Sequence, residues 1–277
     1  MEEYSDKLSR FFDSLTFAGS ILVILFWSVG SPLFYTPDGP VMSIFTAISL
    51  LLLSGIRLAR RYLLRWPVTL SLAVLVITGG GNMSSIMMMT AAPGVLARTS
   101  SPIVMTSVFT SLGILFFCTY ELLVYLRNTP KNVFILDDIL IHLALVPGEL
   151  SLLGHIFNNP TYLSMGIDPR VGISILEMGF MASFAASTIL SNHNLFLWQF
   201  LKGGLSNQII FLSLFSNQYI APVIYLLWAG KGEGNGSFGL ELFIMLAGVF
   251  ATLAFLIIQA YNQNSNLSLS ETESRDK

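Results

Sequence analysis

The sequence predicts an all-α integral membrane protein with eight transmembrane helices. Of its 277 residues, 53% are hydrophobic and only 11% are charged, whereas about 25% of the residues of a soluble domain are charged. Apolar runs of the length that a bilayer core requires, about 20 residues, recur along the whole chain. Lysine and arginine are concentrated in every second connection between these runs, which is typical of cytosolic loops.

The apolar runs place the spans in order, with short polar connections between them. We expect the eight helices at 15–35, 41–58, 67–86, 102–126, 134–156, 171–190, 206–229 and 238–261. Three consecutive glycines interrupt the third, and the fifth carries aspartates, histidines, a proline and a glutamate. Residues 1–14 are polar and contain no A-x-A-like cleavage site, so we expect a cytosolic leader to a retained helix and not a signal peptide.

The basic residues set the orientation. With the N-terminus inside, three basic residues face outward, Arg98, Arg170 and Lys231, and the other eleven of the fourteen are cytosolic. This distribution follows the positive-inside rule. We therefore expect both chain termini in the cytosol.

A short sequence motif, which we call the repeated phrase, recurs at the start of the even-numbered helices. The letters SIFT end at Thr46 and the letters SVFT end at Thr110, and the same alignment places Glu177 and Glu241 at the matching position, with spacings of 64, 67 and 64 residues. Each unit holds two helices, so the repeats run parallel. We expect four helical hairpins at about 15–61, 67–127, 134–190 and 206–261. The alternative is that short loops alone give any eight-helix protein hairpins near this length.

Three segments carry a resemblance to known proteins: "VMSIFTAISLLLLSGIRLAR", "LLGHIFNNPTYLSMGIDPRVGIS" and "GSFGLELFIMLAGVFATLAFLIIQAYNQ". They resemble the N-terminal multi-pass membrane regions of bacterial sensor histidine kinases and related PAS or GGDEF signalling proteins. The resemblance implies a bacterial inner-membrane location and a cytosolic kinase, PAS or cyclase module, or a separate partner protein, that receives the signal. The chain departs from the phrase at Glu177, where the group has threonine. The polar tail 263–277 looks like the start of a signalling helix, or is a solvated tail.

The candidate ligand-binding residues are polar groups in the outer halves of the predicted helices. Ionisable groups within a membrane are costly and are therefore functional candidates. Glu149 follows Pro147, which permits a kink, and shares a helix face with His142 seven residues earlier. We expect an outward-facing polar pocket built from Thr46, Thr110, Glu149, Glu177 and Glu241. The alternative is that each glutamate reaches water at the nearby interface.

Other polar residues have structural interpretations. Asn217 and Gln218 lie mid-membrane, where amides usually hydrogen-bond between helices, and a ligand contact is the alternative. Glu121 is expected to pair with a basic residue near Arg127. A cytosolic basic cluster sets topology and attracts anionic lipid: Arg57, Arg60, Arg61 and Arg65. Asp137 and Asp138 suit the N-terminus of the fifth helix.

Several function classes are excluded. The sequence contains no HExxH, GxSxG, P-loop or TVGYG motif, so we expect no enzymatic activity in this chain alone, no metal and no cofactor. Its single cysteine, Cys118, excludes an internal disulfide framework. A net charge of −2 gives no support for nucleic-acid binding. Membrane lipid is an expected partner. The four hairpins could form a compact eight-helix bundle, or a partly open bundle that is completed by a homodimer.

Two function classes stay open. The first is a membrane sensor or signal-input domain, which the parallel repeats and the tail favour. The second is a small-molecule or cation transporter that uses intramembrane glutamates, which the glycine run and Pro147 favour.

The topology can be tested by labelling single cysteines in intact cells. Cysteines at Asp38, Asn159 and Gly234 should react with an impermeant thiol reagent from outside, because these loops are predicted to be external. A cysteine at Asn128 should not react. Labelling at Asn128 would contradict the eight-helix arrangement.

Overall fold

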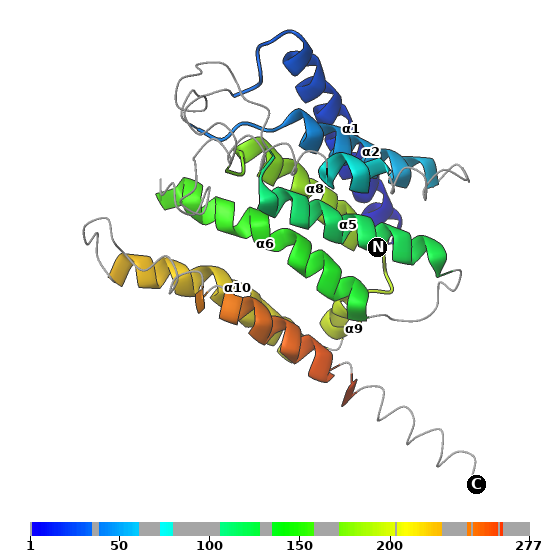
Figure 1. Ribbon diagram of the computed structural model, residues 1–277. Coiled ribbons are helices and arrows are strands. Elements are labelled where there is room, and N and C mark those ends of the chain that lie inside the picture. The colour runs from blue at the N-terminus through cyan, green and yellow to red at the C-terminus, as the bar shows by residue number, and fades with distance from the viewer. Residues whose placement is uncertain are drawn as a thin grey trace, which may run out of the picture. The chain divides into compact units, whose positions relative to one another are not determined.

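The computed structural model describes residues 2–34, 39–60, 73–79, 106–127, 135–157, 172–202, 204–228, 243–244, 246–259 and 261–262. Every regular element in these ranges is a helix (Figure 1), which confirms the predicted all-α class. The helices are α1 (Glu2–Ser28), α2 (Ile44–Arg60), α5 (Val108–Leu126), α6 (Ile135–Phe157), α8 (Ile175–Ser191), α9 (Phe196–Lys202) and α10 (Leu205–Trp228). Residues 73–79 and 246–259 are also helical.

Three of the described helices are long and apolar enough to cross a membrane. These stretches are Glu3–Ser28, Phe109–Leu126 and Ile135–Ile156. The other apolar helices in the described part of the chain are shorter, such as Ile44–Ala59 and Ile175–Ser191. Helical residues occur within each of the eight predicted spans, but crossing by all eight stays a prediction.

The chain divides into two units, and each is described by itself. The first contains residues 1–129 and 140–192, and the second contains 130–139 and 193–277. The caps of α2 and α8 and the contacts of Arg57 described below belong to the first unit.

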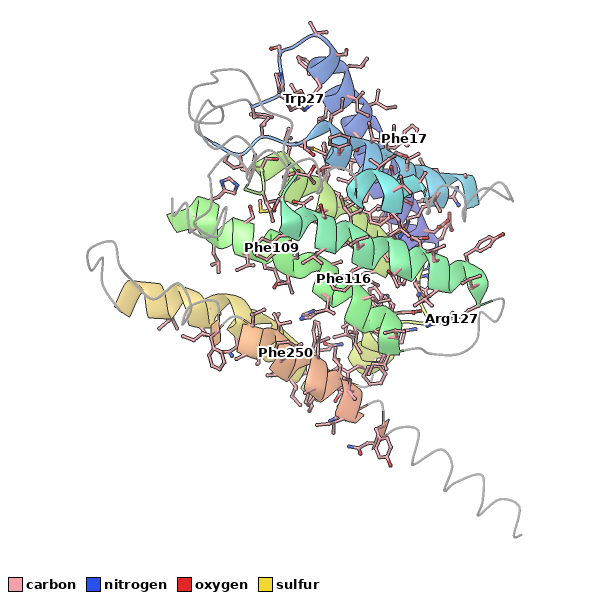
Figure 2. The ribbon with its side chains drawn as sticks, in the orientation of Figure 1. Phe17, Trp27, Phe109, Phe116, Arg127 and Phe250 are labelled. Atoms are coloured by element: carbon pink, nitrogen blue, oxygen red, sulfur yellow. The ribbon has the colours of Figure 1, made fainter. Side chains whose placement is uncertain are left out.

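Helix α1 packs against α2 and α8 and runs antiparallel to both. Near its C-terminal end, the Trp27 indole N–H donates to the Met42 carbonyl oxygen, just before α2, at 2.8 Å (Figure 2). Near its N-terminal end, the Ser5 hydroxyl donates to the carbonyl oxygen of Leu190, at the end of α8, at 2.7 Å. Helix α1 therefore follows both neighbours along most of their length.

Helix α1 begins earlier than the sequence predicts. The expected leader 1–14 is helical from Glu2 and continuous with the apolar part of the helix. Ser9 and Asp13 within this segment are completely buried. The Ser9 hydroxyl lies 3.0 Å from that of Ser187 on α8, so these polar positions are used for packing between helices.

Helices α2, α5 and α8 run parallel with matching positions side by side. At their N-terminal ends, the hydroxyls of Ser43 and Thr106 lie 3.0 Å apart. At the other ends, Arg57 of α2 contacts Glu121 of α5 and Thr188 of α8. These three residues each lie 14 positions after the serine that precedes their helix, which is about 21 Å along a helix axis.

Helix α6 is continuous through Pro147. It approaches α5 closely at Gly113, where an added Cβ would lie 3.0 Å from the Ala144 carbonyl oxygen. On α8, the nearest atom to an added Cβ at Gly148 is the Met178 Cγ, at 3.8 Å. Both contacts lie within the first unit, whose core includes Ile114, Phe117, Met181 and Phe184.

The second unit contains a cap formed across a chain connection. The Asp138 carboxylate accepts hydrogen bonds from the backbone N–H groups of Phe196, at 2.9 Å, and Leu197, at 3.0 Å. Asp138 lies in the first turn of α6, as predicted, and it also caps α9. Phe196 and Phe200 pack with Leu256.

Gly113 should tolerate no branched side chain. We expect Gly113→Val to lower the free energy of unfolding by about 1–3 kcal/mol, because the added methyl groups meet a backbone oxygen that cannot move away easily. Gly148→Ala is the matched control and should be neutral or slightly stabilising. Thermal unfolding of the purified protein in detergent measures both, and equal melting temperatures would contradict the close α5–α6 packing.

Candidate functional site: two buried polar layers

A layer of buried polar side chains lies at the N-terminal ends of α2, α5 and α8. None of its members is more than 5% exposed, and we call it the cap layer: Ser43, Thr46, Thr106, Ser107, Thr110, Ser174 and Glu177. Each helix begins directly after a serine, and the matching threonine or glutamate is its third residue. On α2 and α8 the serine of the repeated phrase is the helix N-cap, and on α8 the third residue, Glu177, completes a capping box.

The Glu177 carboxylate serves two helices. It accepts a hydrogen bond from the backbone N–H of Ser174 at 3.0 Å, while the Ser174 hydroxyl accepts from the Glu177 N–H at 3.2 Å. The same carboxylate accepts from the Thr46 hydroxyl and from the backbone N–H of Ser43. A negative group at a helix N-terminus is favourable. Glu177 thus fastens the starts of α2 and α8 together.

The N-terminus of α5 has no side-chain cap. The Ser107 side chain forms no capping hydrogen bond. The Thr110 hydroxyl is completely buried and has no hydrogen-bond partner among the described residues. Of the three equivalent helix starts, α5 is the one whose capping positions are not used.

Glu149 lies at the level of the cap layer. It is 5% exposed, and its neighbour Gly148 faces Met178, the residue after Glu177. Pro147 lies against Gly113, one turn from Thr110. The structure therefore brings Thr46, Thr110 and Glu177 together with Glu149 at one level, and contact between the two carboxylates stays a prediction.

The remaining candidates lie elsewhere or are not described. His142 is half-buried and precedes Glu149 by two turns of α6. Asn217 is exposed on α10, in the second unit. Gln218 is helical but its side chain is not described, and Glu241 and the tail 263–277 lie outside the described residues.

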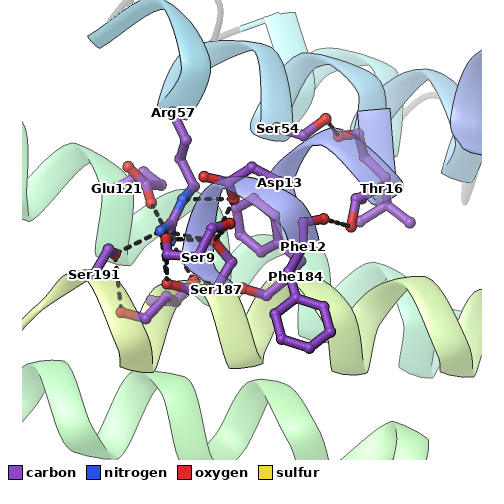
Figure 3. Close-up of polar contacts among 12 residues, drawn as sticks. Ser9, Phe12, Asp13, Thr16, Ser54, Arg57, Glu121, Phe184, Ser187 and Ser191 are labelled. Atoms are coloured by element: carbon purple, nitrogen blue, oxygen red, sulfur yellow. Dashed lines mark hydrogen bonds and ion pairs between the residues drawn. The ribbon is translucent and has the colours of Figure 1, made fainter. Parts of the chain in front are cut away.

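A second polar layer lies at the opposite ends of the same helices, and we call it the arginine network (Figure 3): Asp13, Arg57, Glu121, Ser187, Thr188 and Ser191. The Arg57 guanidinium is 3.1 Å from Asp13 Oδ1 and 3.5 Å from Glu121 Oε1. All three side chains are at most 6% exposed.

Helix α8 supplies the remaining acceptors for Arg57. Nη1 donates to the Thr188 hydroxyl at 2.6 Å, and Nη2 donates to the Ser187 carbonyl oxygen at 2.9 Å and to the Ser191 hydroxyl at 2.5 Å. The guanidinium carbon lies 5.3 Å from the centre of the Phe184 ring, within range of a cation–π interaction. Four helices, α1, α2, α5 and α8, therefore meet at one cation.

The arginine network is not predicted by the sequence. The sequence pattern assigns Arg57 to a cytosolic basic cluster that sets topology and attracts anionic lipid, whereas the structure buries it at 7% exposure. Glu121 is expected to pair with a basic residue near Arg127, but it pairs with Arg57. The repeat spacing could have indicated this pairing, because Glu121 and Thr188 follow Arg57 by 64 and 131 residues.

The two layers differ in chemistry. The arginine network contains one cation and two carboxylates, and the charges are largely satisfied within the protein. The cap layer is rich in hydroxyls, contains no basic residue, and has one unused hydroxyl at Thr110. No cluster of three histidine, cysteine, aspartate or glutamate side chains suited to a metal occurs in the described ranges. The cap layer is therefore the better candidate for binding a ligand.

Comparison with known proteins gives no relative: no family model matches the chain, and neither does any curated protein or solved structure.

Removing the buried cation should be strongly destabilising. Arg57→Met should lower the free energy of unfolding by about 3–5 kcal/mol, because Asp13 and Glu121 would remain buried without their counter-charge. Lys7→Met is the control, since Lys7 forms an exposed pair with Glu3 and such pairs contribute little. The arginine network would be refuted as a stabilising element if both variants unfold at the wild-type temperature.

Proposed function

We propose that the chain is a membrane-embedded signal-input domain. It senses an outer-leaflet ligand, pH or the state of the bilayer, and passes the signal to a cytosolic module or partner protein. In this proposal the chain has eight spans in four parallel hairpins, with the cap layer near the outer surface of a bacterial inner membrane and the arginine network near the cytosol.

The observation that carries the proposal is that the same three parallel helices hold both layers. The cap residues and the arginine contacts are separated by the same number of positions on α2, α5 and α8. Helices of this kind move as rigid rods, so a change in spacing at one end is transferred to the other. A ligand in the cap layer would then alter the arginine network about 21 Å away.

Helix α1 extends this coupling. Its Asp13 pairs with Arg57, and its Ser5 contacts the end of α8 at Leu190. A shift of α8 would therefore also shift the N-terminal end of α1, at the side that we assign to the cytosol. The resemblance to the membrane regions of sensor kinases supports the same assignment.

The equal offsets also support the repeated hairpins. Independent helices with similar loops have no reason to place an N-cap serine and an interior polar contact at the same separation three times. The helix starts follow the predicted spacings of 64 and 67 residues. The fourth unit would contain Glu241.

The second candidate function is transport of a small molecule or cation. It is supported by two buried carboxylates, Glu149 and Glu177, at one level. Transporters commonly form such sites with broken helices, and α6 runs unbroken through Pro147. This continuity favours the input domain.

Spin labels at the presumed cytosolic ends can test the coupling. Ser5→Cys and Leu190→Cys, in a Cys118→Ala background, place labels on α1 and α8. In sealed proteoliposomes, a pH step on the outer side should change the dipolar broadening between the labels. Glu149→Gln should remove this response, because the amide imitates the protonated acid in shape and cannot titrate.

The control is Glu3→Gln, which changes an exposed carboxylate and should leave the response intact. A wild-type protein whose labels ignore outer pH, combined with cation or proton uptake that depends on Glu149, would favour the transporter.

A further inference from the structure

The N-terminus of α5 lacks the side-chain cap that completes α2 and α8. On α2, the Ser43 hydroxyl accepts from the Thr46 N–H at 3.0 Å, and on α8 the Ser174 hydroxyl accepts from the Glu177 N–H at 3.2 Å. Ser107 forms no such bond at the start of α5. A helix start carries N–H groups without helical partners and a partial positive charge.

A second observation points to a ligand at this helix start. The Thr110 hydroxyl is 0% exposed and has no hydrogen-bond partner in the described part of the chain. Its counterparts reach back to their own N-cap residues: Thr46 lies 2.9 Å from the Ser43 hydroxyl, and Glu177 accepts from the Ser174 N–H. The Cα–Cβ bonds of a helix tilt toward its N-terminus, so the Thr110 side chain extends from its backbone toward the start of α5.

We propose that the N-terminus of α5 and the Thr110 hydroxyl together bind the carboxylate group of a small ligand. The proposal rests on the input function above and names the chemical class that the cap layer senses. At the equivalent position of α8 the group present is itself a carboxylate, that of Glu177. Helix N-termini bind such groups through backbone N–H donors, and the threonine hydroxyl adds one more donor.

Two buried carboxylates lie at the level of this helix start. Glu177 of α8 accepts hydrogen bonds from donors of α2 and α8, so its oxygens are already engaged. Glu149 of α6 lies at the same level and is buried, so its charge would repel a bound carboxylate. Neutralising Glu149 should therefore strengthen binding.

Acetate is the probe for this site. The purified full chain in detergent is titrated with acetate, with the neutral isostere acetamide, and with chloride, and its thermal unfolding is followed. Acetate should raise the melting temperature in a saturable manner, because a ligand that binds only the folded state stabilises it. Acetamide and chloride should give a smaller shift at equal concentration.

The variants identify the site. Thr110→Val should weaken acetate binding about tenfold or more, the effect of losing one hydrogen bond to a charged group. Without acetate it should melt like the wild type, because no hydrogen bond is lost. Thr46→Val is the matched control: it should melt lower without acetate, because its hydroxyl donates to Glu177, and it should keep the acetate response. Glu149→Gln should bind acetate more tightly.

The proposal is overturned if Thr110→Val binds acetate like the wild type, if it melts lower without acetate, or if chloride and acetate act equally. The spin-label experiment tests the input function separately from the acetate titration, which tests the site. Acetate binding with no change at the labels would refute the input function and leave the site, whereas a response of the labels to pH without acetate binding would refute the site alone.

Discussion

The buried guanidinium of Arg57 constrains the first unit more than any other group described. A charge taken out of water is tolerated only when it is paired and its donors are satisfied. Arg57 is paired with Asp13 of α1 and Glu121 of α5, and it donates to Thr188 of α8. None of these helices could shift along its axis by a turn without losing one of these contacts. The contacts of Arg57 therefore add a directional constraint to the packing of the apolar surfaces at this end of the helices.

At the other end the constraint is the helix starts themselves. Backbone N–H groups that are buried without partners are costly. On α2 and α8, the N-cap serines and Glu177 accept hydrogen bonds from these N–H groups and so offset most of this cost. With both ends fixed, the intervening helical segments have little freedom except to move together, which is the property that a signal-input domain requires. The N-terminus of α5 has no side-chain cap, and it is the position in the cap layer where we propose that a ligand binds and alters the packing of the helices.

Much of this arrangement could be predicted from the sequence. Hydrophobic length identified the helical class, and the repeated phrase correctly aligned Thr46, Thr110 and Glu177, because capping has a sequence signature. The capping role of the phrase was not predicted, since the same threonine or glutamate residues suit a helix cap and a ligand site. Arg57 was misplaced for a related reason: counting basic residues gives the side of the membrane but not the direction of a side chain. The early start of α1 was hidden by its polar residues, of which Ser5, Ser9 and Asp13 contact α8 instead of water. Glu241 and the tail remain untested.

The order of Arg57 and its partners along the chain has a consequence for biosynthesis. At about 5–20 residues per second, the ribosome makes Glu121 and Thr188, which lie 64 and 131 residues after Arg57, several seconds or more after α2 has emerged. During that interval the one ion-pair partner already synthesised is Asp13. Asp13 of α1 therefore supplies the first counter-charge to Arg57, and the contacts with α5 and α8 are added to this pair as those helices are synthesised.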